Sequence, residues 1–90
     1  MKSGVSSRFR KLLQALPKDV RKQAATAYRL FKKDPYHPSL HFKEVIPKDH
    51  IYSVRIGDSY RALGRREEDD LIAWFWIGSH AEYDNLLRKR

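Results

Sequence analysis

A serine, a histidine and a glutamate follow the longest apolar run of this chain. The segment FWIGSHAEYDNLL, residues 75–87, passes to Ser79, His80 and Glu82 directly after that run. Ser79 and Glu82 have the spacing of a capping box, which closes the start of a helix. His80 has no part in that motif. An imidazole titrates near neutral pH and can accept or donate a proton, so His80 is a candidate general acid or base.

His80 falls at the first position of the predicted helix, just after a buried strand. The positive end of the helix dipole lies beside such a position and disfavours a protonated imidazole. We therefore expect a solvent-facing, neutral His80 that can accept a proton. The alternative is an ordinary surface histidine at a helix start.

Two arginines lie on either side of a Gly-Asp turn signal, on segments that are expected to pair. They are Arg55 and Arg61. A guanidinium keeps its charge at any physiological pH and binds phosphate oxygens through two parallel hydrogen bonds. If Arg55, Arg61 and His80 share one face, they form a phosphate-binding surface with a proton shuttle. The alternatives are a solvated sheet face or an ion pair with Glu44 or Asp58.

Other side chains could extend this surface. Lys43 and Arg65 lie on neighbouring segments, and Tyr83 could stack on an RNA base. Tyr83 also lies on the apolar stripe of the last helix, so a core position is an equal alternative. His37 and His41 are separated by a proline and have no carboxylate cluster beside them. We therefore expect no metal site, and nothing in the chain points to a cofactor.

The first third of the chain has the spacing of two helices that meet at Pro17. Ser6 or Ser7 can cap the first helix, and proline suits the start of the second because its missing N–H is not needed there. Each segment has one apolar face at helical spacing. The apolar positions are Phe9, Leu12, Leu13 and Leu16, then Val20, Ala24, Ala27, Tyr28 and Phe31. We expect a helical hairpin with one buried seam.

The pattern changes to that of strands after DPYHP, residues 34–38, because each proline drives its predecessor toward extended backbone. The expected strands span residues 40–45, 51–56, 59–64 and 70–78, with charged residues 65–70 as a turn. The last strand is apolar on both sides, so we expect it in the centre of a sheet. One side of this strand holds Leu71, Ala73 and Phe75, and the other side holds Ile72, Trp74 and Trp76.

A short last helix is expected from Ser79, with Tyr83, Leu86 and Leu87 as its buried positions. The fold class is therefore α+β. Two N-terminal helices pack on a twisted, mainly antiparallel sheet of three to four strands, with a short C-terminal helix. Arg88, Lys89 and Arg90 form a basic end that suits the negative pole of that helix.

The length and charge of the chain limit the functions that it could have. The 90 residues, 1–90, make one domain, and 19 Lys and Arg against 11 Asp and Glu give a formal net charge of +8. Such a surplus fits a polyanionic partner, and the alternatives are an acidic protein, an anionic membrane surface or a charge that serves solubility alone. The absence of cysteine excludes disulfides and thiolate chemistry. We expect a cytoplasmic protein, because no apolar run reaches the ~20 residues needed to cross a membrane and no secretory signal is evident.

The order of elements, the phrase HPSLHFKEV, the pair YSVRIG and SYRALG, and the closing WFWIGSHAEYDNLL resemble the RelE/ParE superfamily of toxins from type II toxin–antitoxin systems. The resemblance covers roughly residues 8–88. It implies a toxin with an acidic, amphipathic antitoxin as its partner. RelE-like members cut messenger RNA on the ribosome without a metal, whereas ParE-like members inhibit DNA gyrase and have no nuclease centre.

The resemblance implies roles for individual residues. His80, Arg55, Arg61 and Tyr83 match or lie near catalytic positions of the nuclease branch, and Lys43, Arg55, Arg61 and Arg65 would bind RNA. Glu44 is a second candidate on the first strand. We expect a metal-independent, ribosome-dependent endoribonuclease. The alternatives are a non-catalytic gyrase inhibitor and an inactive toxin fold that only binds an antitoxin.

Overall fold

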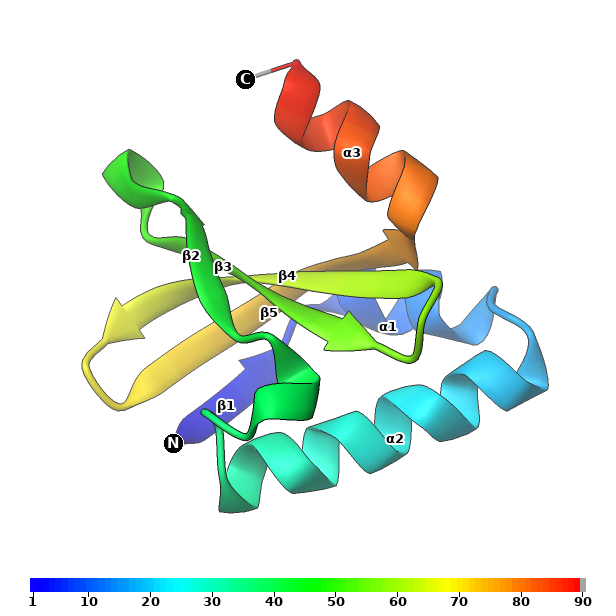
Figure 1. Cartoon of the computed structure of the whole chain (residues 1–90), viewed down its shortest axis with the longest axis horizontal. Coiled ribbons are helices and arrows are strands. Elements are labelled where there is room, and N and C mark those ends of the chain that lie inside the picture. The colour runs from blue at the N-terminus through cyan, green and yellow to red at the C-terminus, as the bar shows by residue number, and fades with distance from the viewer. Residues whose placement is uncertain (90) are drawn as a thin grey trace.

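The computed structural model describes residues 1–89. Within them, five strands and three helices follow one another along the chain (Figure 1). Their bounds are β1 Lys2–Val5, α1 Ser7–Gln14, α2 Lys18–Lys33, β2 Lys43–Ile46, β3 Ile51–Ile56, β4 Tyr60–Glu68, β5 Leu71–Ser79 and α3 His80–Arg88. Short 3-10 turns at Pro38–Leu40 and Pro47–Asp49 flank β2. The predicted α+β class is confirmed.

The strands form one mixed sheet in the order β1-β5-β4-β3-β2, and the helices cover it from both sides (Figure 1). Helices α1 and α2 pack on one face, where Phe9, Ala24 and Phe31 meet Val54 and Trp74. Helix α3 packs on the other face, where Tyr83 meets Ile51, Leu63 and Trp76. We call this second face the α3 face. The two cores are separate, and the sheet lies between them.

The two N-terminal helices form as expected, but they pack on the sheet and do not meet in one tight seam, since a cavity lies between them. Ser6 is the N-cap of α1, and its hydroxyl accepts a hydrogen bond from the backbone N–H of Phe9 at 3.1 Å. Pro17 precedes α2 as its N-cap residue. Phe9, Val20, Ala24 and Phe31 are buried, and all but Val20 belong to the core between these helices and the sheet. These helices therefore owe their place to an apolar face at 3.6-residue spacing.

The N-terminal strand was not predicted, and it raises the sheet to five strands. β1 pairs in parallel with β5, which makes β5 an interior strand between β1 and β4, while β4 is the middle strand of the sheet. The backbone N–H of Lys2 donates to the carbonyl of Asp70 at 2.9 Å, and the terminal amine lies 3.8 Å from the Asp70 carboxylate. The four residues KSGV have no alternating pattern of their own, so their extended form depends on β5 as a partner.

Two predicted strand boundaries were wrong. The first strand was expected at residues 40–45, but β2 is Lys43–Ile46, because Pro38 opens a 3-10 turn that ends in a left-handed residue, His41, with φ 47°. The turn expected over residues 65–70 is also shorter, since β4 continues to Glu68. Backbone pairing with β5 carries β4 past the core, where its charged side chains reach solvent.

The predicted sides of β5 are wrong beyond residue 74. Leu63 pairs with Trp76 while the next β4 residue, Gly64, pairs with Trp74, so Phe75 is the extra residue of a β-bulge. The extra residue of a bulge interrupts the alternation of side chains between the two faces of the sheet. Residues two apart across the bulge therefore point to opposite faces. Trp74 therefore faces α1 and α2, whereas Trp76 lies in the core of the α3 face. A strict alternation had placed both tryptophans on one side.

The end of α3 also differs from expectation. Tyr83 is buried and Leu87 is partly buried, but Leu86 is 37% exposed. Residues 83 and 87 share one i, i+4 row on the helix, and this row alone rests on the sheet. The predicted basic end extends to Arg90, which lies outside the described residues.

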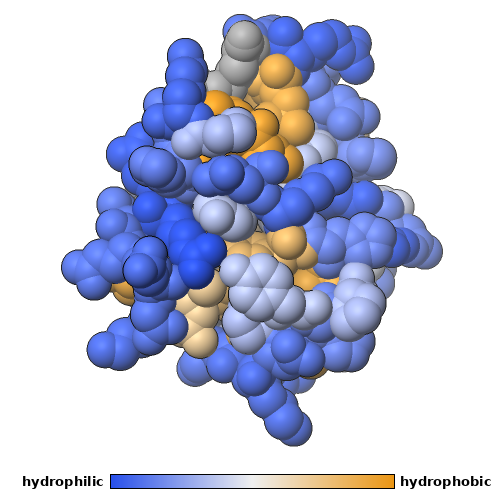
Figure 2. Space-filling model, turned by 60° about the vertical axis from the view of Figure 1, so that its left-hand side comes forward, coloured by the Kyte–Doolittle hydropathy of each residue, from blue (hydrophilic) through white to orange (hydrophobic). Residues whose placement is uncertain are grey.

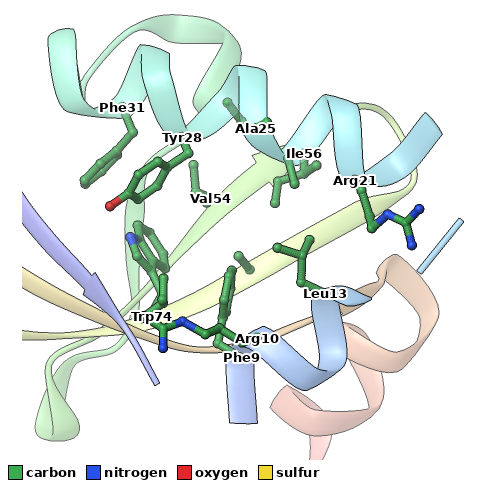
Figure 3. A pocket seen from close by; sticks show the side chains of 14 residues that line it. Phe9, Arg10, Leu13, Arg21, Ala25, Tyr28, Phe31, Val54, Ile56 and Trp74 are labelled. Atoms are coloured by element: carbon green, nitrogen blue, oxygen red, sulfur yellow. The ribbon is translucent and has the colours of Figure 1, made fainter. Parts of the chain in front are cut away.

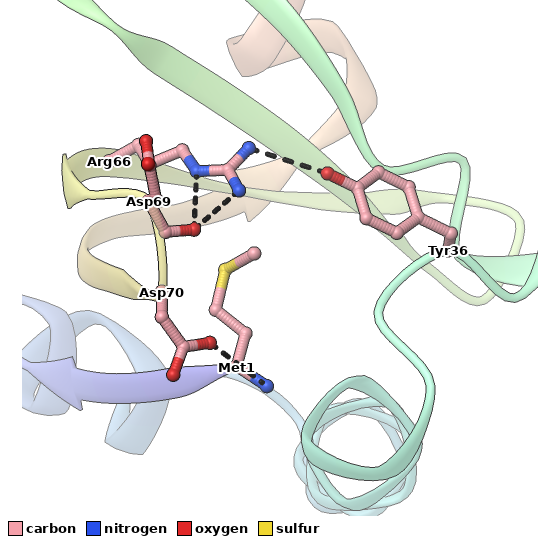
Figure 4. A network of polar contacts seen from close by, with 5 residues as sticks. All are labelled: Met1, Tyr36, Arg66, Asp69 and Asp70. Atoms are coloured by element: carbon pink, nitrogen blue, oxygen red, sulfur yellow. Dashed lines mark hydrogen bonds and ion pairs between the residues drawn. The ribbon is translucent and has the colours of Figure 1, made fainter.

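Polar contacts hold the loop before β2 against β4 (Figure 4). The Arg66 guanidinium donates to the hydroxyls of Tyr36 and Tyr52, both at 3.3 Å, and to the carbonyl of Asp69. The bonds to Tyr52 and then Tyr36 raise the pKa of Arg66 above its ordinary value.

Hydrophilic residues cover most of the face seen in Figure 2, and apolar atoms show only in small areas. No helix within residues 1–89 is long and apolar enough to cross a membrane.

Candidate functional site

Two arginines face each other across the β3–β4 hairpin. Arg55 pairs directly with Arg61, and Arg61 pairs on its other side with Gly78 of β5. Direct partners in antiparallel strands project from the same face of a sheet. Ser53, two residues before Arg55, bonds to Tyr83 of α3, so this shared face is the α3 face. The expected pairing of the two arginines is confirmed by the strand register.

The two guanidinium groups have different partners. Arg55 forms an ion pair with Asp58 and donates from Nε to the carbonyl of Gly57 at 2.9 Å. Arg61 donates to the carbonyl of Tyr60 at 2.7 Å and makes no ion pair within residues 1–89. The Asp58 contact is one of the alternatives that the sequence left open. Arg61 therefore keeps an uncompensated positive charge beside a partly neutralised one.

His80 begins α3 at the same end of the sheet. The backbone N–H of His80 donates to the carbonyl of Ser59 at 2.8 Å, which ties the helix start to the turn between β3 and β4. The imidazole is 51% exposed. The start of α3 and the arginine hairpin are thus joined by a direct backbone bond, and His80 is open to solvent.

The cap that precedes His80 forms as predicted. The backbone N–H of Ser79 donates to the Glu82 carboxylate at 3.0 Å, and the N–H of Glu82 donates to the Ser79 hydroxyl at 3.2 Å. The bond from the Ser79 backbone, followed by that from its hydroxyl, lowers the pKa of Glu82 below its ordinary value. Glu82 is therefore an ionised structural group of the helix start.

A carboxylate that the sequence reasoning missed lies next to His80. Asp84 Oδ1 is 3.5 Å from His80 Nε2, one turn further along α3. Side chains four residues apart lie on the same face of a helix, and this spacing in the predicted helix was the available signal. A carboxylate in this place can hold the orientation of the ring. His80 and Asp84 are therefore an exposed histidine–carboxylate pair.

Tyr83 lies in the core. It is 7% exposed, and its hydroxyl donates to the Ser53 hydroxyl at 3.2 Å. Its ring centroid is 6.0 Å from that of His80, so the buried tyrosine ring lies next to the exposed imidazole. This position matches the core alternative that the sequence left open, and packing accounts for Tyr83.

Lys43 and Arg65 project from the same face as the arginine pair, but they are further away. Lys43 pairs with Ser53, and Arg65 pairs with Ile51, both of which belong to the α3 face. Arg65 is four residues from Arg61 along β4, or about 13 Å in an extended strand. These basic groups therefore form a spread surface and not one pocket.

Glu44 is separated from this surface. Its cross-strand partner is Tyr52, which belongs to the face of α1 and α2, and its carboxylate lies 4.0 Å from His50. Glu44 is therefore not a partner of Arg55 or His80 in this structure.

A cavity of about 370 Å³ lies between α1, α2 and the sheet (Figure 3). Its wall is mainly apolar, with Phe9, Phe31 and Trp74 pointing inward and Arg10 and Arg21 at its margin. No histidine or carboxylate lines this cavity. Within residues 1–89, no three His, Cys, Asp or Glu side chains are placed to hold a metal ion.

Comparison with known proteins identifies similar chains. A family profile described as ParE-like toxin domain matches residues 18–85. A search of curated protein sequences found no match.

Three solved structures share the fold. The RelB–RelE antitoxin–toxin complex from Methanococcus jannaschii matches at 17% identity and TM-score 0.70, over 91% of this chain and 95% of that chain. The RelE–RelB complex from Pyrococcus horikoshii matches at 18% identity and TM-score 0.67, over 87% and 92%. The isolated E. coli RelE toxin matches at 15% identity and TM-score 0.63, over 99% and 98%.

Proposed function

This chain belongs to the ParE-like toxin domain family of the RelE/ParE toxin superfamily, and from that premise we propose that it is the toxin of a type II toxin–antitoxin pair. We further propose that it is an endoribonuclease that cleaves messenger RNA on the ribosome in the cytoplasm. Its substrate is a single ribose–phosphate linkage, and its chemistry needs no bound cofactor.

The arrangement of His80 next to the arginine pair carries this proposal. An exposed imidazole with its own carboxylate lies at the start of α3, which is bonded to the hairpin that presents Arg55 and Arg61. A protein that acted only by binding would have no use for a proton-transfer pair. Two like charges at opposed cross-strand positions repel each other, and only Arg55 has a carboxylate beside it. A phosphodiester supplies the anion that Arg61 lacks.

The reaction follows from these groups. A base takes the proton of a ribose 2′-hydroxyl, and the oxygen attacks the adjacent phosphorus. The bond to the 5′-oxygen breaks, and that oxygen receives a proton, which leaves a 2′,3′-cyclic phosphate and a free 5′-hydroxyl. His80 serves as one of the two proton-transfer groups, with Asp84 orienting its ring. Arg55 and Arg61 stabilise the added charge on the phosphate oxygens.

The ribosome is part of this proposal because the site is open. His80 and Asp84 lie on the surface of α3, and Lys43 and Arg65 are spread along the sheet. Such a site does not by itself hold the 2′-hydroxyl in line with the leaving oxygen. Much of the rate of an intramolecular attack comes from that alignment. A ribosome that fixes the messenger would provide it, so we expect weak activity on free RNA.

The proposed partner is an acidic, amphipathic antitoxin. Two of the matching structures are antitoxin–toxin complexes, and this chain carries a formal charge of +8. Acidic side chains would pair with Arg10 and Arg21, and apolar side chains would enter the cavity between α1 and α2. A small acidic protein encoded next to this chain would support the pairing.

Non-catalytic inhibition of DNA gyrase is the alternative, in keeping with the ParE-like family description. The test is induced expression of the wild type and His80→Ala, followed by mapping of transcript ends. We expect in-frame cuts with the wild type and a loss of about 10²- to 10⁴-fold in the variant. Toxicity that persists in His80→Ala, with intact transcripts in both strains, would favour the inhibitor instead.

A further inference from the structure

A second hollow includes Arg55, one member of the arginine pair, at the open edge of β3. It has a volume of about 520 Å³ and lies between α2 and the turn that joins β3 to β4. Its polar wall consists of Lys22, Gln23, Thr26, Ser39, Arg55 and Asp58. Unlike the apolar cavity between α1 and α2, this cleft has hydrogen-bonding groups on several sides.

The cleft is continuous with the candidate site because Arg55 belongs to both. β2 pairs with β3 only as far as Ser53, so residues 54–56 of β3 have no strand on their outer side. α2 passes along this part of β3, and the space between them is the cleft. A strand of RNA whose phosphate lies on Arg61 and Arg55 would pass around the open edge of β3 to bring its next nucleotide to the cleft.

Gln23 is the group best placed to read that nucleotide. Its side chain packs on Gly57, where a Cβ atom would collide with the Gln23 amide and where φ is +59°. Gly57 thus allows both the tight turn and the approach of Gln23. The Gln23 amide forms no hydrogen bond to residues 1–89, so its two donors and its acceptor are available to a base edge.

Lys22 supplies a charge at the same place. It lines the cleft from α2, and its ammonium group makes no ion pair within the described part of the chain. Thr26 is less available, because its hydroxyl already donates to the carbonyl of Lys22 at 3.1 Å. The free groups of the cleft are therefore an amide and an ammonium, which suit a base and a phosphate respectively.

We propose that this cleft binds the nucleotide next to the cleaved linkage and that Gln23 sets the preference for its base. Lys22 binds the phosphate on the far side of that nucleotide, and Arg55 binds the scissile one. This inference rests on the proposed ribonuclease function and adds a specificity determinant to it. An amide that pairs with a base edge through two hydrogen bonds discriminates among bases by roughly fivefold or more.

The test is the base composition around the cuts. Gln23→Leu keeps a side chain of similar size against Gly57 and removes the donors and acceptor. Gln14→Leu is the matched control, since Gln14 lies on α1 outside the cleft and uses only its backbone carbonyl, toward Arg21. Each variant is expressed and its transcript ends are mapped, with thermal unfolding of the purified proteins as a check on folding.

We expect wild type and Gln14→Leu to share one base preference at a position adjacent to the cut. Gln23→Leu should flatten that preference by at least about fivefold while cutting continues. Lys22→Gln should reduce cutting at all sites more than Lys18→Gln does. Cuts with an unchanged base preference in a folded Gln23→Leu variant would overturn this inference alone. A wild type that makes no cuts would overturn the proposed function, and the inference with it.

Discussion

Arg55 and Arg61 form a cross-strand pair of like charges, and only Arg55 has a carboxylate beside it. Like charges in such a pair repel, so the hairpin accepts a cost in stability at this place. Asp58 relieves part of that cost while the site is empty. Because Asp58 is a highly exposed turn residue, a bound phosphate can replace it without burying a charge. In the proposed mechanism, Arg55 exchanges the Asp58 carboxylate for the phosphate of the RNA.

Asp84 allows a test at the level of a single residue. Asp84→Asn removes the charge beside His80 Nε2, and we expect slower transcript cleavage because the ring loses its orienting partner. The loss should be smaller than the ~10²–10⁴-fold that a general acid or base contributes. Asp84→Glu should restore part of the activity, which a purely structural role would not require.

The control for this experiment is Asn85→Ala, a neighbouring exposed position on α3. Cleavage at the wild-type rate by a folded Asp84→Asn variant would show that His80 works without the carboxylate.

At the level of elements, the start of α3 sets the position of His80. The capping box lowers the pKa of Glu82, so the ionised carboxylate stabilises the folded state. A depressed pKa gives stability that is present above the pKa of the unfolded chain and is lost as the pH falls through the folded value. The window therefore starts near the ordinary glutamate value of 4.5 and extends below it.

Glu82→Gln tests this dependence. The free energy of unfolding, measured with urea from about pH 6 to about pH 3, should fall less steeply in the variant than in the wild type. The variant should be slightly less stable at neutral pH, since glutamine fills a capping box less strongly than a carboxylate. Glu67→Gln, at an exposed position of β4, is the control. Parallel curves for wild type and Glu82→Gln would mean that the cap does not form in solution.

The β-bulge in β5 gives a second test at this level. A Cβ atom at Gly64 would lie 2.7 Å from Trp74 and 2.9 Å from Ile72, so the glycine is needed for the close approach of the two strands. Gly64→Ala should therefore lower the free energy of unfolding by about 1–3 kcal/mol. Gly4→Ala is the control, because a Cβ there meets nothing within 4 Å. Equal stability of the two variants would contradict this packing.

Periodicity and capping predicted most elements, since α1, α2, β3, β5 and α3 follow from residues that are local in sequence. The features that these local patterns did not predict depend on contacts with residues far away in the sequence. β1 needs β5, and the bulge at Phe75 appears only when two strands are set side by side. The same holds for the site. The turn signal predicted the pairing of Arg55 with Arg61, whereas the separation of Glu44 from them depends on the register of β2.

For the molecule as a whole, the formal charge of +8 is unevenly distributed. Residues 8–33 hold nine of the 19 basic residues, and residues 67–70 hold four of the 11 acidic ones. The acidic cluster lies at the β4–β5 turn, at the opposite end of β4 from the turn beside His80. A polyanion is therefore favoured at the end that carries the candidate site, and two basic surfaces compete for it: the α1–α2 hairpin and the α3 face.

The salt dependence of binding separates these two surfaces. The ligand is a ribosome with a messenger that carries 2′-deoxyribose at the site of cleavage, so that it binds but is not cut. Affinity falls as the salt concentration rises. For each phosphate contact that is lost, the magnitude of the slope of log affinity against log salt should become smaller by about 0.7. We expect this decrease for Arg61→Gln and Lys43→Gln on the α3 face. Arg8→Gln and Lys11→Gln on α1 should leave the slope unchanged, because we assign α1 and the adjoining apolar cavity to the antitoxin, whereas Lys22 of α2 lines the cleft that we assign to RNA. The reverse pattern would place the RNA on α1 and remove the α3 face from the proposed mechanism.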